Sequence, residues 1–443
     1  MAEQKYTISD IIERYISGDW GNDEPTEDAS CPVSCIRGAD IVPIYNSEYT
    51  NIPLRYISEK SLASRALQEG DIVIEKSGGS PTQSTGRVVY ISKELLEEKQ
   101  DIVCSNFCAA FRIKPGWDAK YVYYYLQHIY NAGVFFNFEG KTSGLKNLIM
   151  DTAFKSITIK KIAIETQRSI ATVLSTIESK MAANRAINHY LEAMAKQLYD
   201  YWFVQFDFPD ANGKPYKSSG GKMVWNKKLK REIPEGWTLQ PFSKYMNIFT
   251  GKKDVSKVTP GNYKFFSCAP DPITSNEYIY DGDAILVSGN GSYTGRVSYY
   301  NGKMDLYQRT YGCSPKSTYA SIMPFMYYHM KLMFEPLNTG GKHGSSIPYI
   351  VLGDLADFFV LEDVSVMKKF SELINPLFRT HMEYIAKSKE LLQEYKDMIL
   401  PLLMAGQVSV TPLNNDLTKH NTMTICVVYI EPTIFVEVKL YHA

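Results

Sequence analysis

No apolar run in this sequence approaches the roughly 20 residues that a membrane-spanning helix needs. The opening residues, "MAEQKYTISD", also lack the basic start, apolar centre and small-residue cleavage site of a secretory signal. The chain has 443 residues, of which 44% are hydrophobic and 22% charged, which is ordinary for a water-soluble protein of two or three domains. We therefore expect a cytoplasmic protein without a membrane partner.

Cysteine is scarce, and its number, seven, is odd, which favours reduced thiols over a disulfide framework. Two CxxxC pairs, Cys31 with Cys35 and Cys104 with Cys108, could close a tetrahedral zinc site. The usual zinc knuckle has about two intervening residues rather than three, and "CSNFCAAFRI" is typical of a buried strand. We favour buried thiols and assign no metal ligands, with zinc as the alternative.

Catalytic motifs are also missing. The sequence contains neither HExxH nor GxSxG, and its histidines include no pair at metal-binding spacing. "EGKTS" resembles the end of a phosphate-binding loop, but Phe135 stands where that loop needs a glycine. Residues 375–378, "NPLF", lack the second proline of a methyltransferase NPP[FY] motif, and "DIVIEK" lacks the separated Glu and Lys of a common nuclease site. We predict no catalytic residues in this chain.

What the sequence does contain is an internal repeat. "SGGSPTQSTGRVVY", which begins at Ser77, is echoed by "SGNGSYTGRVSYY", which begins at Ser288, and a Gly-Asp pair precedes each. Further on, "FEGKTSG" is echoed by "NTGGKHGS". Each half contains short strands with Gly, Ser, Thr and Pro between them, an aromatic stretch, a Gly-Lys loop and a long helix. The order predicts two similar domains.

Each long helix carries a heptad seam, which is a row of mostly apolar residues spaced alternately four and three positions apart. Every position of one seam lies 200 residues from its counterpart, so the two helices are expected to pair with each other. The first seam is Ile170, Leu174, Ile177, Met181, Asn184, Asn188, Leu191, Ala195, Leu198 and Trp202, and the second is Phe370, Ile374, Leu377, His381, Tyr384, Ser388, Leu391, Tyr395, Met398 and Leu402.

An antiparallel pairing of these seams has a preferred register. Placing Asn184 opposite Ser388 also places Asn188 opposite Tyr384 and brings the polar layers together. The same register sets Met181 opposite Leu391. A helix from about 167 to 203 would be roughly 55 Å long and would hold two globular halves apart. We expect Pro376 in a first turn and Pro401 at an end or kink; two helices on separate local cores are the alternative.

The segment between the halves is rich in Pro, Gly and Ser from 209 to 221, which indicates a linker. From 213 to 257 the chain has eleven basic residues against three acidic ones, although its formal net charge is +0. This segment is either a solvated face or a surface for phosphate groups. Alternation in "TICVVYI", after 423, would suit an edge strand, but the sequence offers it no partner.

The sequence therefore predicts an α+β fold with two similar loop-rich α/β domains, separated by two long helices that form an antiparallel intramolecular coiled coil with pseudo-two-fold symmetry. The expected boundaries are 1–160 for the first domain, 161–206 for the first helix, 207–236 for the linker, 237–364 for the second domain, 365–406 for the second helix and 407–443 for a C-terminal tail of unknown role.

This arrangement resembles the specificity subunit of Type I restriction-modification systems. The resemblance rests on the first helix with the following "FDFPDANGKPYKSSGG" and "REIPEGW", and on "GDIVIEKSGG" and "GDAILVSGNGSYTGR" within the domains. It implies that each domain recognises one half of a split double-stranded DNA target, and that the helices set the spacing and dock two methyltransferase subunits. Restriction and translocase subunits would complete the assembly, and S-adenosylmethionine, ATP and Mg²⁺ would bind to those partners rather than to this chain.

The loops supply the expected DNA contacts, because their side chains offer donors and acceptors to bases and phosphates. The first set is Lys76, Ser77, Ser80, Gln83, Arg87, Lys141, Thr142, Ser143 and Lys146, and the second is Ser288, Asn290, Ser292, Tyr293, Arg296, Lys342, His343, Ser345 and Ser346. The sets differ, which predicts two different half-sites. A coiled-coil scaffold for protein partners and a stand-alone DNA-modifying enzyme are the alternatives.

Overall fold

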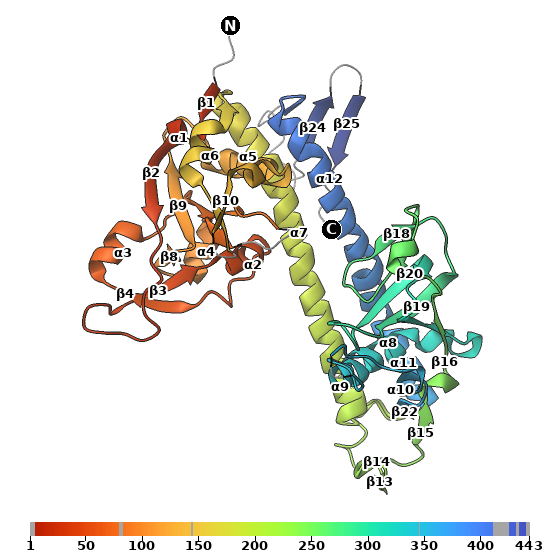
Figure 1. Cartoon of the computed structure of the whole chain (residues 1–443). Helices are drawn as coiled ribbons and strands as arrows, with labels where there is room; N and C mark the ends of the chain where they lie inside the picture. The colour runs from red at the N-terminus through yellow and green to blue at the C-terminus, as the bar shows by residue number, and fades with distance from the viewer. Residues whose placement is uncertain are drawn as a thin grey trace, which may run out of the picture. The chain divides into compact units, whose positions relative to one another are not determined.

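The structure, a computed structural model, describes residues 5–78, 83–142, 145–344, 346–410, 425–430 and 434–439. It divides into two compact units, Met1–Ala183 with Leu391–Ala443 and Asn184–Glu390. Both mix helices with small sheets, so the predicted α+β class is confirmed (Figure 1). Within the described ranges, no helix is long and apolar enough to cross a membrane.

The first unit contains two main sheets. One has the order β2-β9-β5-β7 and the other β4-β3-β8. Every residue of β5 is buried, the three apolar residues Ile72, Val73 and Ile74 as well as Glu75, because the strand lies between β9 and β7. The bounds are Ile12–Ser17 for β2, Cys108–Ile113 for β9, Ile72–Glu75 for β5, Val88–Tyr90 for β7, Leu54–Ile57 for β4, Cys31–Ile36 for β3 and Ile102–Cys104 for β8.

The second unit repeats this strand order in a single sheet, β16-β21-β19-β20-β17-β18. β20 alone corresponds to β7 and β8, and its parallel pairing with β17 corresponds to that of β8 with β3. The internal repeat in the sequence is therefore a repeat in the fold. The bounds are Met246–Thr250 for β16, Thr310–Pro315 for β21, Tyr280–Ser288 for β19, Val297–Leu306 for β20, Tyr263–Phe266 for β17 and Ile273–Ser275 for β18.

The aromatic stretch of each half forms a helix that packs on the sheet. Tyr124 of α5 and Phe325 of α8 are almost completely buried in the core of their own unit. α5 spans Ala119–Asn131, and α8 spans Met323–His329 and continues as a π-helical turn to Phe334. The other helices are α1 (Ile8–Ile11), α2 (Ile41–Tyr45), α3 (Glu59–Arg65), α4 (Lys93–Glu98), α6 (Met150–Ser156), α9 (Glu335–Asn338) and α10 (Leu352–Ala356).

The first long helix, α7, runs from Ile164 to Tyr199 and continues as a π-helical turn to Val204. Its seam lies where the periodicity places it. Ile177, Met181 and Asn184 are buried, whereas Asn188, Leu191 and Leu198 are half-buried. Because α7 shows no irregularity before Tyr199, the heptad phase holds along it.

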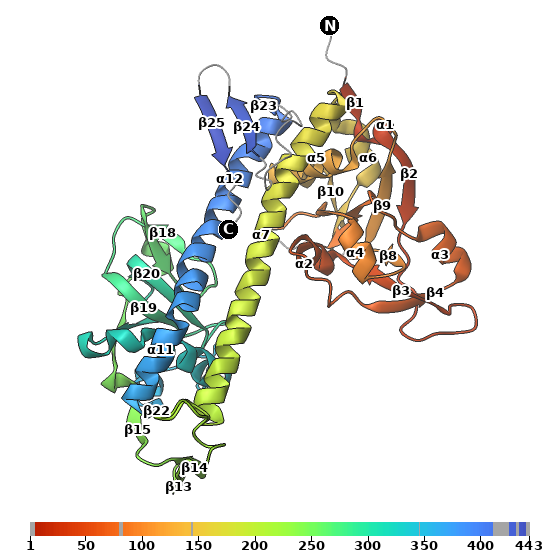
Figure 2. The ribbon, with the colours of Figure 1, turned by 180° about the vertical axis from the view of Figure 1, so that it is seen from behind.

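The second long helix is interrupted. It consists of α11 (Val364–Arg379), a π-helical turn from Thr380 to Ile385, and α12 (Ala386–Met404). α11 and α12 are labelled in Figure 2, which gives the view from behind. The expected position of Pro376 in a first turn is wrong, because the helix begins twelve residues earlier, at Val364. Pro401 does not end the helix at once either, since α12 continues to Met404. The buried face of α11, which includes Phe370, Ile374 and Phe378, stabilises it on both sides of Pro376.

The π-helical turn shifts the second seam by one residue. Tyr384, Leu391 and Met398, expected in the interface, are 73%, 50% and 52% exposed. Ile385 and Ile399, the residues after two of them, are buried instead. A π turn contains one extra residue, so every later residue rotates around the helix axis relative to the heptad pattern. Leu377, before the turn, is half-buried and His381, within it, is buried, as expected. Ser388, after the turn, is still half-buried and bonds to Asn184.

The segment 207–236, expected as a linker, is folded. Phe206 and Phe208 pack against Trp237, with ring centroids 5.7 and 5.1 Å apart. Asp207 accepts hydrogen bonds from the backbone and hydroxyl of Ser218, which lower the pKa of its carboxyl. The segment contains a hairpin of β13 (Met223–Asn226) and β14 (Arg231–Pro234) and is followed by β15 (Thr238–Pro241), which pairs with β22 (Phe359–Glu362).

Past α12, β23 (Val408–Val410), β24 (Ile425–Ile430) and β25 (Ile434–Lys439) form an antiparallel sheet. β24 lies between the other two, so the expectation of an edge strand without a partner is wrong. Earlier in the first unit, β1 (Lys5–Thr7) pairs with β12 (Thr158–Lys160), and β6 (Ser77–Gly78), β10 (Glu139–Thr142) and β11 (Leu145–Leu148) form a third small sheet.

Candidate nucleic-acid interface

In the first unit, the two loops chosen from the sequence lie side by side. β6, from the Ser-Gly loop, pairs with β11, from the Gly-Lys loop, so that Ser77 faces Asn147 and Gly78 faces Lys146. The Ser77 hydroxyl also donates a hydrogen bond to the Asn147 side chain. The backbone of Lys76 accepts a 2.7 Å hydrogen bond from the Leu148 amide. Residues 70 positions apart in the sequence therefore form one surface.

Arg87 lies in this region but is held in an ion pair. Its guanidinium donates two hydrogen bonds, of 2.8 and 2.6 Å, to the carboxylate of Glu75, which is 2% exposed. These bonds raise the pKa of Arg87. A Cβ at Gly78 would lie 2.8 Å from the Glu75 carboxylate, which explains glycine at that position. The geometry gives Arg87 a positioning role beneath the loop, and direct contact with DNA stays a prediction.

Lys146, which is half-buried, and Gln83, which is exposed, connect the same loops. The Lys146 ammonium lies 3.4 Å from the Glu139 carboxylate and donates a 3.1 Å hydrogen bond to the Gln83 carbonyl. Glu139 also accepts from the backbone and hydroxyl of Thr85. The loop between Glu75 and Arg87 is thus fastened to the Gly-Lys hairpin by charged as well as backbone contacts.

The second unit brings its own two loops together in the same way. The Gly291 amide donates to the Pro348 carbonyl, and the Ile350 amide donates to the Gly289 carbonyl. The Thr294 hydroxyl also donates a 2.9 Å hydrogen bond to the Pro348 carbonyl. Both units therefore carry one composite loop surface.

The side chains on the second surface differ from those on the first. The Arg296 guanidinium donates a 2.9 Å hydrogen bond to the Ala269 carbonyl and lies 5.8 Å from the centroid of Tyr293, which is 47% exposed. Ser288 is buried and donates to a backbone carbonyl. Asn290 accepts a contact from the Cys268 thiol, and Ser292 is exposed.

The Gly-Lys loop of the second unit is organised by one carboxylate. Asp354 lies 3.8 Å from the Lys342 ammonium and 3.2 Å from Nε2 of His343. The His343 ring stacks on Tyr349 at 5.3 Å. Ser346 is exposed. These contacts leave Lys342 and His343 each more than 40% exposed, so both can still meet a ligand.

Several expected contacts cannot be placed. Ser80, Ser143 and Ser345 lie outside the described residues, as do the side chains of Lys141 and Thr142, whose backbone belongs to β10.

Backbone hydrogen bonds give the true alignment of the two loops. Glu75 bonds to Gly86 and Arg87 through its own carbonyl and amide, and Ser288 bonds to Gly295 and Arg296 in the same way. Ser288 therefore corresponds to Glu75 rather than to Ser77, its match in the sequence repeat. The first loop is longer, which is why matching the Ser-Gly pairs misplaced it.

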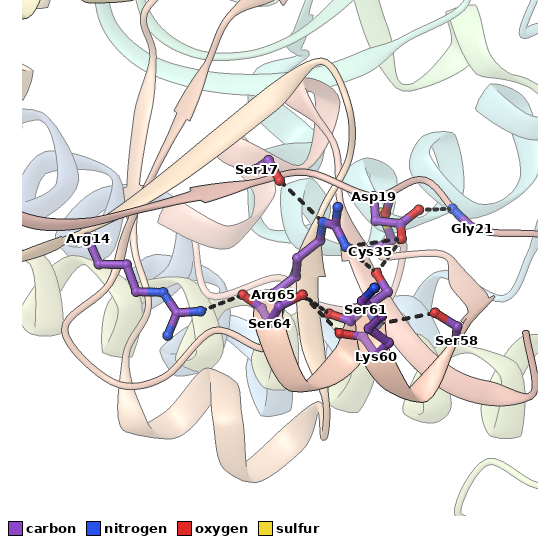
Figure 3. A network of polar contacts seen from close by, with 10 residues as sticks. All are labelled: Arg14, Ser17, Asp19, Gly21, Cys35, Ser58, Lys60, Ser61, Ser64 and Arg65. Atoms are coloured by element: carbon purple, nitrogen blue, oxygen red, sulfur yellow. Dashed lines mark hydrogen bonds and ion pairs between the residues drawn. The ribbon is translucent and has the colours of Figure 1, made fainter.

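A polar network beside the first surface fastens α3 to the end of β2 (Figure 3). Arg14 donates a 2.7 Å hydrogen bond to the Ser64 carbonyl, and Arg65 donates to the hydroxyls of Ser17 and Ser61 at 3.3 and 2.8 Å. Ser61 in turn donates to the Asp19 carboxylate. Ser61 is buried, and the contacts described for it include no histidine that could act as its base. The network fixes the turn that contains Asp19.

The cysteines of the two CxxxC pairs lie mostly in the core. Cys35, Cys104 and Cys108 are buried, and Cys31 is half-buried. Burial raises the pKa of the Cys35 thiol to about 12 and that of Cys108 to about 11. Zinc binding requires thiolates, which such burial disfavours. In the described part of the chain, no group of three or more His, Cys, Asp or Glu side chains is placed to hold a metal ion.

Comparison with known proteins gives a family for this fold. Residues 27–193 match the Type I restriction modification DNA specificity domain. The specificity subunit of the Type I restriction enzyme MjaIX from Methanocaldococcus jannaschii is 23% identical over 416 residues, which cover 85% of this chain and 88% of that protein. The chain is similar to the specificity subunits of Type I restriction-modification systems along most of its length. The predicted resemblance is confirmed.

Two further matches agree. The specificity subunit of the Escherichia coli enzyme EcoDI is 27% identical over 184 residues, or 40% of each chain. The crystal structure of a Type I S subunit from M. genitalium has a TM-score of 0.55 at 14% identity and covers 90% of this chain and 95% of that one. That likeness shows that the two chains share a fold along most of their length.

Proposed function

We propose that each unit of this specificity subunit recognises one half of a bipartite double-stranded DNA target. The observation that carries the proposal is the repeated sheet order, with one composite loop surface in each unit and different side chains on the two surfaces. Two equivalent surfaces with unequal chemistry suit a target whose halves differ in sequence.

The side chains on these surfaces have the chemistry that base recognition requires. Gln83 in the first unit, and Lys342 and His343 in the second, are exposed and offer donors and acceptors for base edges or phosphates, and the half-buried Lys146 adds a positive charge. The basic stretch from 213 to 257 would add phosphate contacts. Lys141, Thr142, Ser143 and Ser345 stay in the proposal as sequence-based contacts.

The remaining activities of the complex would belong to partners. In the proposal, the long helices dock two methyltransferase subunits and set the length of the gap between the half-sites. S-adenosylmethionine, ATP and Mg²⁺ would bind to methyltransferase and restriction subunits, and the chain itself would not catalyse. The complex would act on adenine in cytoplasmic DNA.

Co-expression with a methyltransferase subunit encoded beside this chain tests the proposal. We expect genome-wide mapping of adenine methylation to find one split motif that disappears when this chain is omitted. Methylation that does not depend on the chain would favour a scaffold role, and methyl transfer by the purified chain alone would favour a stand-alone enzyme.

A further inference from the structure

The same tight turn follows the central strands of both units. In the first it joins β8 to β9, and the Cys108 amide donates to the Ser105 carbonyl. In the second it joins β20 to β21, and the Thr310 amide donates to the Tyr307 carbonyl. Strand pairing gives the same match independently of the turns. Glu75 and Ser288 are equivalent, and they face Cys108 and Thr310, the residues that follow the two turns.

The last residue of each turn is bonded to the loop surface. The Phe107 carbonyl accepts hydrogen bonds from the amides of Lys76 and Ser77, at 2.8 and 3.1 Å. The Arg309 carbonyl accepts a 2.8 Å hydrogen bond from the Gly289 amide. Phe107 and Arg309 therefore occupy equivalent positions, each at the edge of its own composite loop surface.

Both side chains are presented to solvent. Phe107 is 57% exposed, although it is large and apolar. Arg309 is exposed, and among the described residues its guanidinium has neither an ion pair nor a hydrogen bond. Arg87 and Arg296, by contrast, both use their guanidinium groups within the protein. A rigid backbone with a free side chain suits contact with a ligand.

Phe107 lies beside a pocket whose accessible surface is mainly apolar. Its ring lines this pocket, of about 510 Å³, together with Trp20, Ala39 and Gly78. Trp20 is held by Arg55, whose guanidinium lies 4.1 Å from the Trp20 ring centroid and donates to its carbonyl. The polar network of Figure 3 fixes the adjacent Asp19. Arg37, Ser77 and Asn106 also line the pocket, but most of its accessible surface is apolar.

We propose that Phe107 and Arg309 are specificity-determining residues, of which Phe107 contacts a thymine methyl group and Arg309 bonds to a guanine edge. The inference rests on the proposed function and deepens it. Apolar side chains recognise the thymine methyl group in the major groove, and arginine donates two hydrogen bonds to guanine O6 and N7. The equivalent turns thus recognise different bases in the two half-sites.

Base analogues test the inference with the full chain and its methyltransferase subunits. Duplexes carry the mapped methylation motif, with uracil in place of each thymine or 7-deazaguanine in place of each guanine, one position at a time. Wild-type binding should weaken about fourfold at one thymine of one half-site, from loss of one methyl contact. It should weaken about 5- to 150-fold at one guanine of the other half-site.

Two variants assign these effects to residues. Phe107→Ala should lose the sensitivity to uracil and keep every other sensitivity, and Arg309→Ala should lose only the sensitivity to 7-deazaguanine. Leu54→Ala, which removes an apolar side chain that is 58% exposed on β4, and Lys369→Ala, which removes an exposed cation on α11, are the controls and should change neither.

The outcomes separate the inference from the proposed function. If the wild-type complex shows no sequence-dependent binding, the proposed function fails, and the inference fails with it. If the wild type binds the split motif but the variants keep both sensitivities, only the inference is overturned. A uniform loss on all duplexes for Arg309→Ala, or a half-site without the required base, overturns it as well.

Discussion

Asn184 and Ser388 join the two long helices inside the second unit. The Asn184 amide nitrogen donates a 2.9 Å hydrogen bond to the Ser388 hydroxyl, and Asn184 is 7% exposed. This is the polar layer that the heptad seams predicted, so the register is confirmed at this point. Farther along α7, the Glu192 carboxylate lies 3.3 Å from the His381 ring. From Asn184 to Glu192 the residue number rises on α7 while that of the partner falls from 388 to 381, so the two helices run antiparallel in this unit.

Removing one partner of this layer should destabilise the second unit. Ser388→Ala leaves a buried amide without its acceptor, and we expect the free energy of unfolding to fall by about 1–3 kcal/mol. Combining it with Asn184→Leu removes the unpaired group and should recover most of the loss. Urea unfolding measures both. Ser179→Ala, on an exposed part of α7, is the matched control and should change stability by less than about 0.5 kcal/mol. Equal effects of the two serine variants would contradict the account.

The Arg87–Glu75 ion pair predicts a structural rather than a recognition defect. Arg87→Ala leaves a buried carboxylate unpaired, which should lower the free energy of unfolding by about 3–5 kcal/mol. Adding Glu75→Gln should restore part of it, because the amide carries no charge. Lys93→Ala breaks an exposed ion pair with Glu97 and should have an effect within about 1 kcal/mol. An Arg87→Ala chain with wild-type stability but altered DNA preference would instead make Arg87 a direct contact.

His329 predicts a dependence of stability on pH. Burial lowers the pKa of its imidazole to about 4. Its Nε2 donates to the Phe359 carbonyl at 3.2 Å, so Nδ1 accepts from the Tyr199 hydroxyl at 2.7 Å. The unfolded chain, with an ordinary histidine pKa of about 6.5, binds more protons between pH 4 and 6.5, and stability is lost as pH falls through this window.

A variant isolates this effect from other titrating groups. His329→Gln should be less stable than the wild type at pH 7, and the difference should shrink by about 3 kcal/mol on going from pH 6.5 to pH 4. Urea midpoints across this range measure it. His189→Gln, at an exposed position on α7, controls for loss of a histidine. A difference that stays constant with pH would show that His329 does not become protonated on unfolding.

Lys396 fastens α12 to the first unit. It is 5% exposed, and its ammonium donates to Glu178 at 2.6 Å and to the Tyr45 hydroxyl at 2.8 Å. Burial opposes the charge of Lys396, but Glu178 and Tyr45 hold its pKa above the ordinary value. We expect Lys396→Met to lower stability by about 3–5 kcal/mol, because it leaves Glu178 unpaired.

Hydrogen exchange locates that loss. Amides of 391–404 should exchange faster in Lys396→Met, while those of α11 should not change. Lys389→Met, at an exposed position of the same helix, should leave both unchanged. Faster exchange in α11 alone would contradict this role.

The sequence predicted the long helices correctly only where the helix is regular. α7 has no interruption before Tyr199, so its heptad phase predicted Ile177, Met181 and Asn184 correctly as buried. On the second helix the phase failed at Tyr384, Leu391 and Met398, although Ser388 kept its predicted partner, because a π-helical turn has no signature in apolar spacing.

The loops were also predicted correctly in part. The Gly-Arg pairs matched correctly, since Gly86 and Gly295 form equivalent backbone bonds, but unequal loop lengths misaligned the Ser-Gly pairs. Phe107 was overlooked because it follows a strand without any motif, and only strand pairing shows that it corresponds to Arg309. Lys396 was overlooked because its acidic partner comes from a helix more than two hundred residues earlier in the chain.

The most direct test of the central claim is exchange of one recognition domain. Residues 6–154 would be replaced by the corresponding residues of a related specificity subunit, and adenine methylation would be mapped genome-wide in cells that also express the methyltransferase subunit. The account predicts a new split motif in which one half has changed while the other half and the gap are retained. A change in both halves, or in neither, would contradict it.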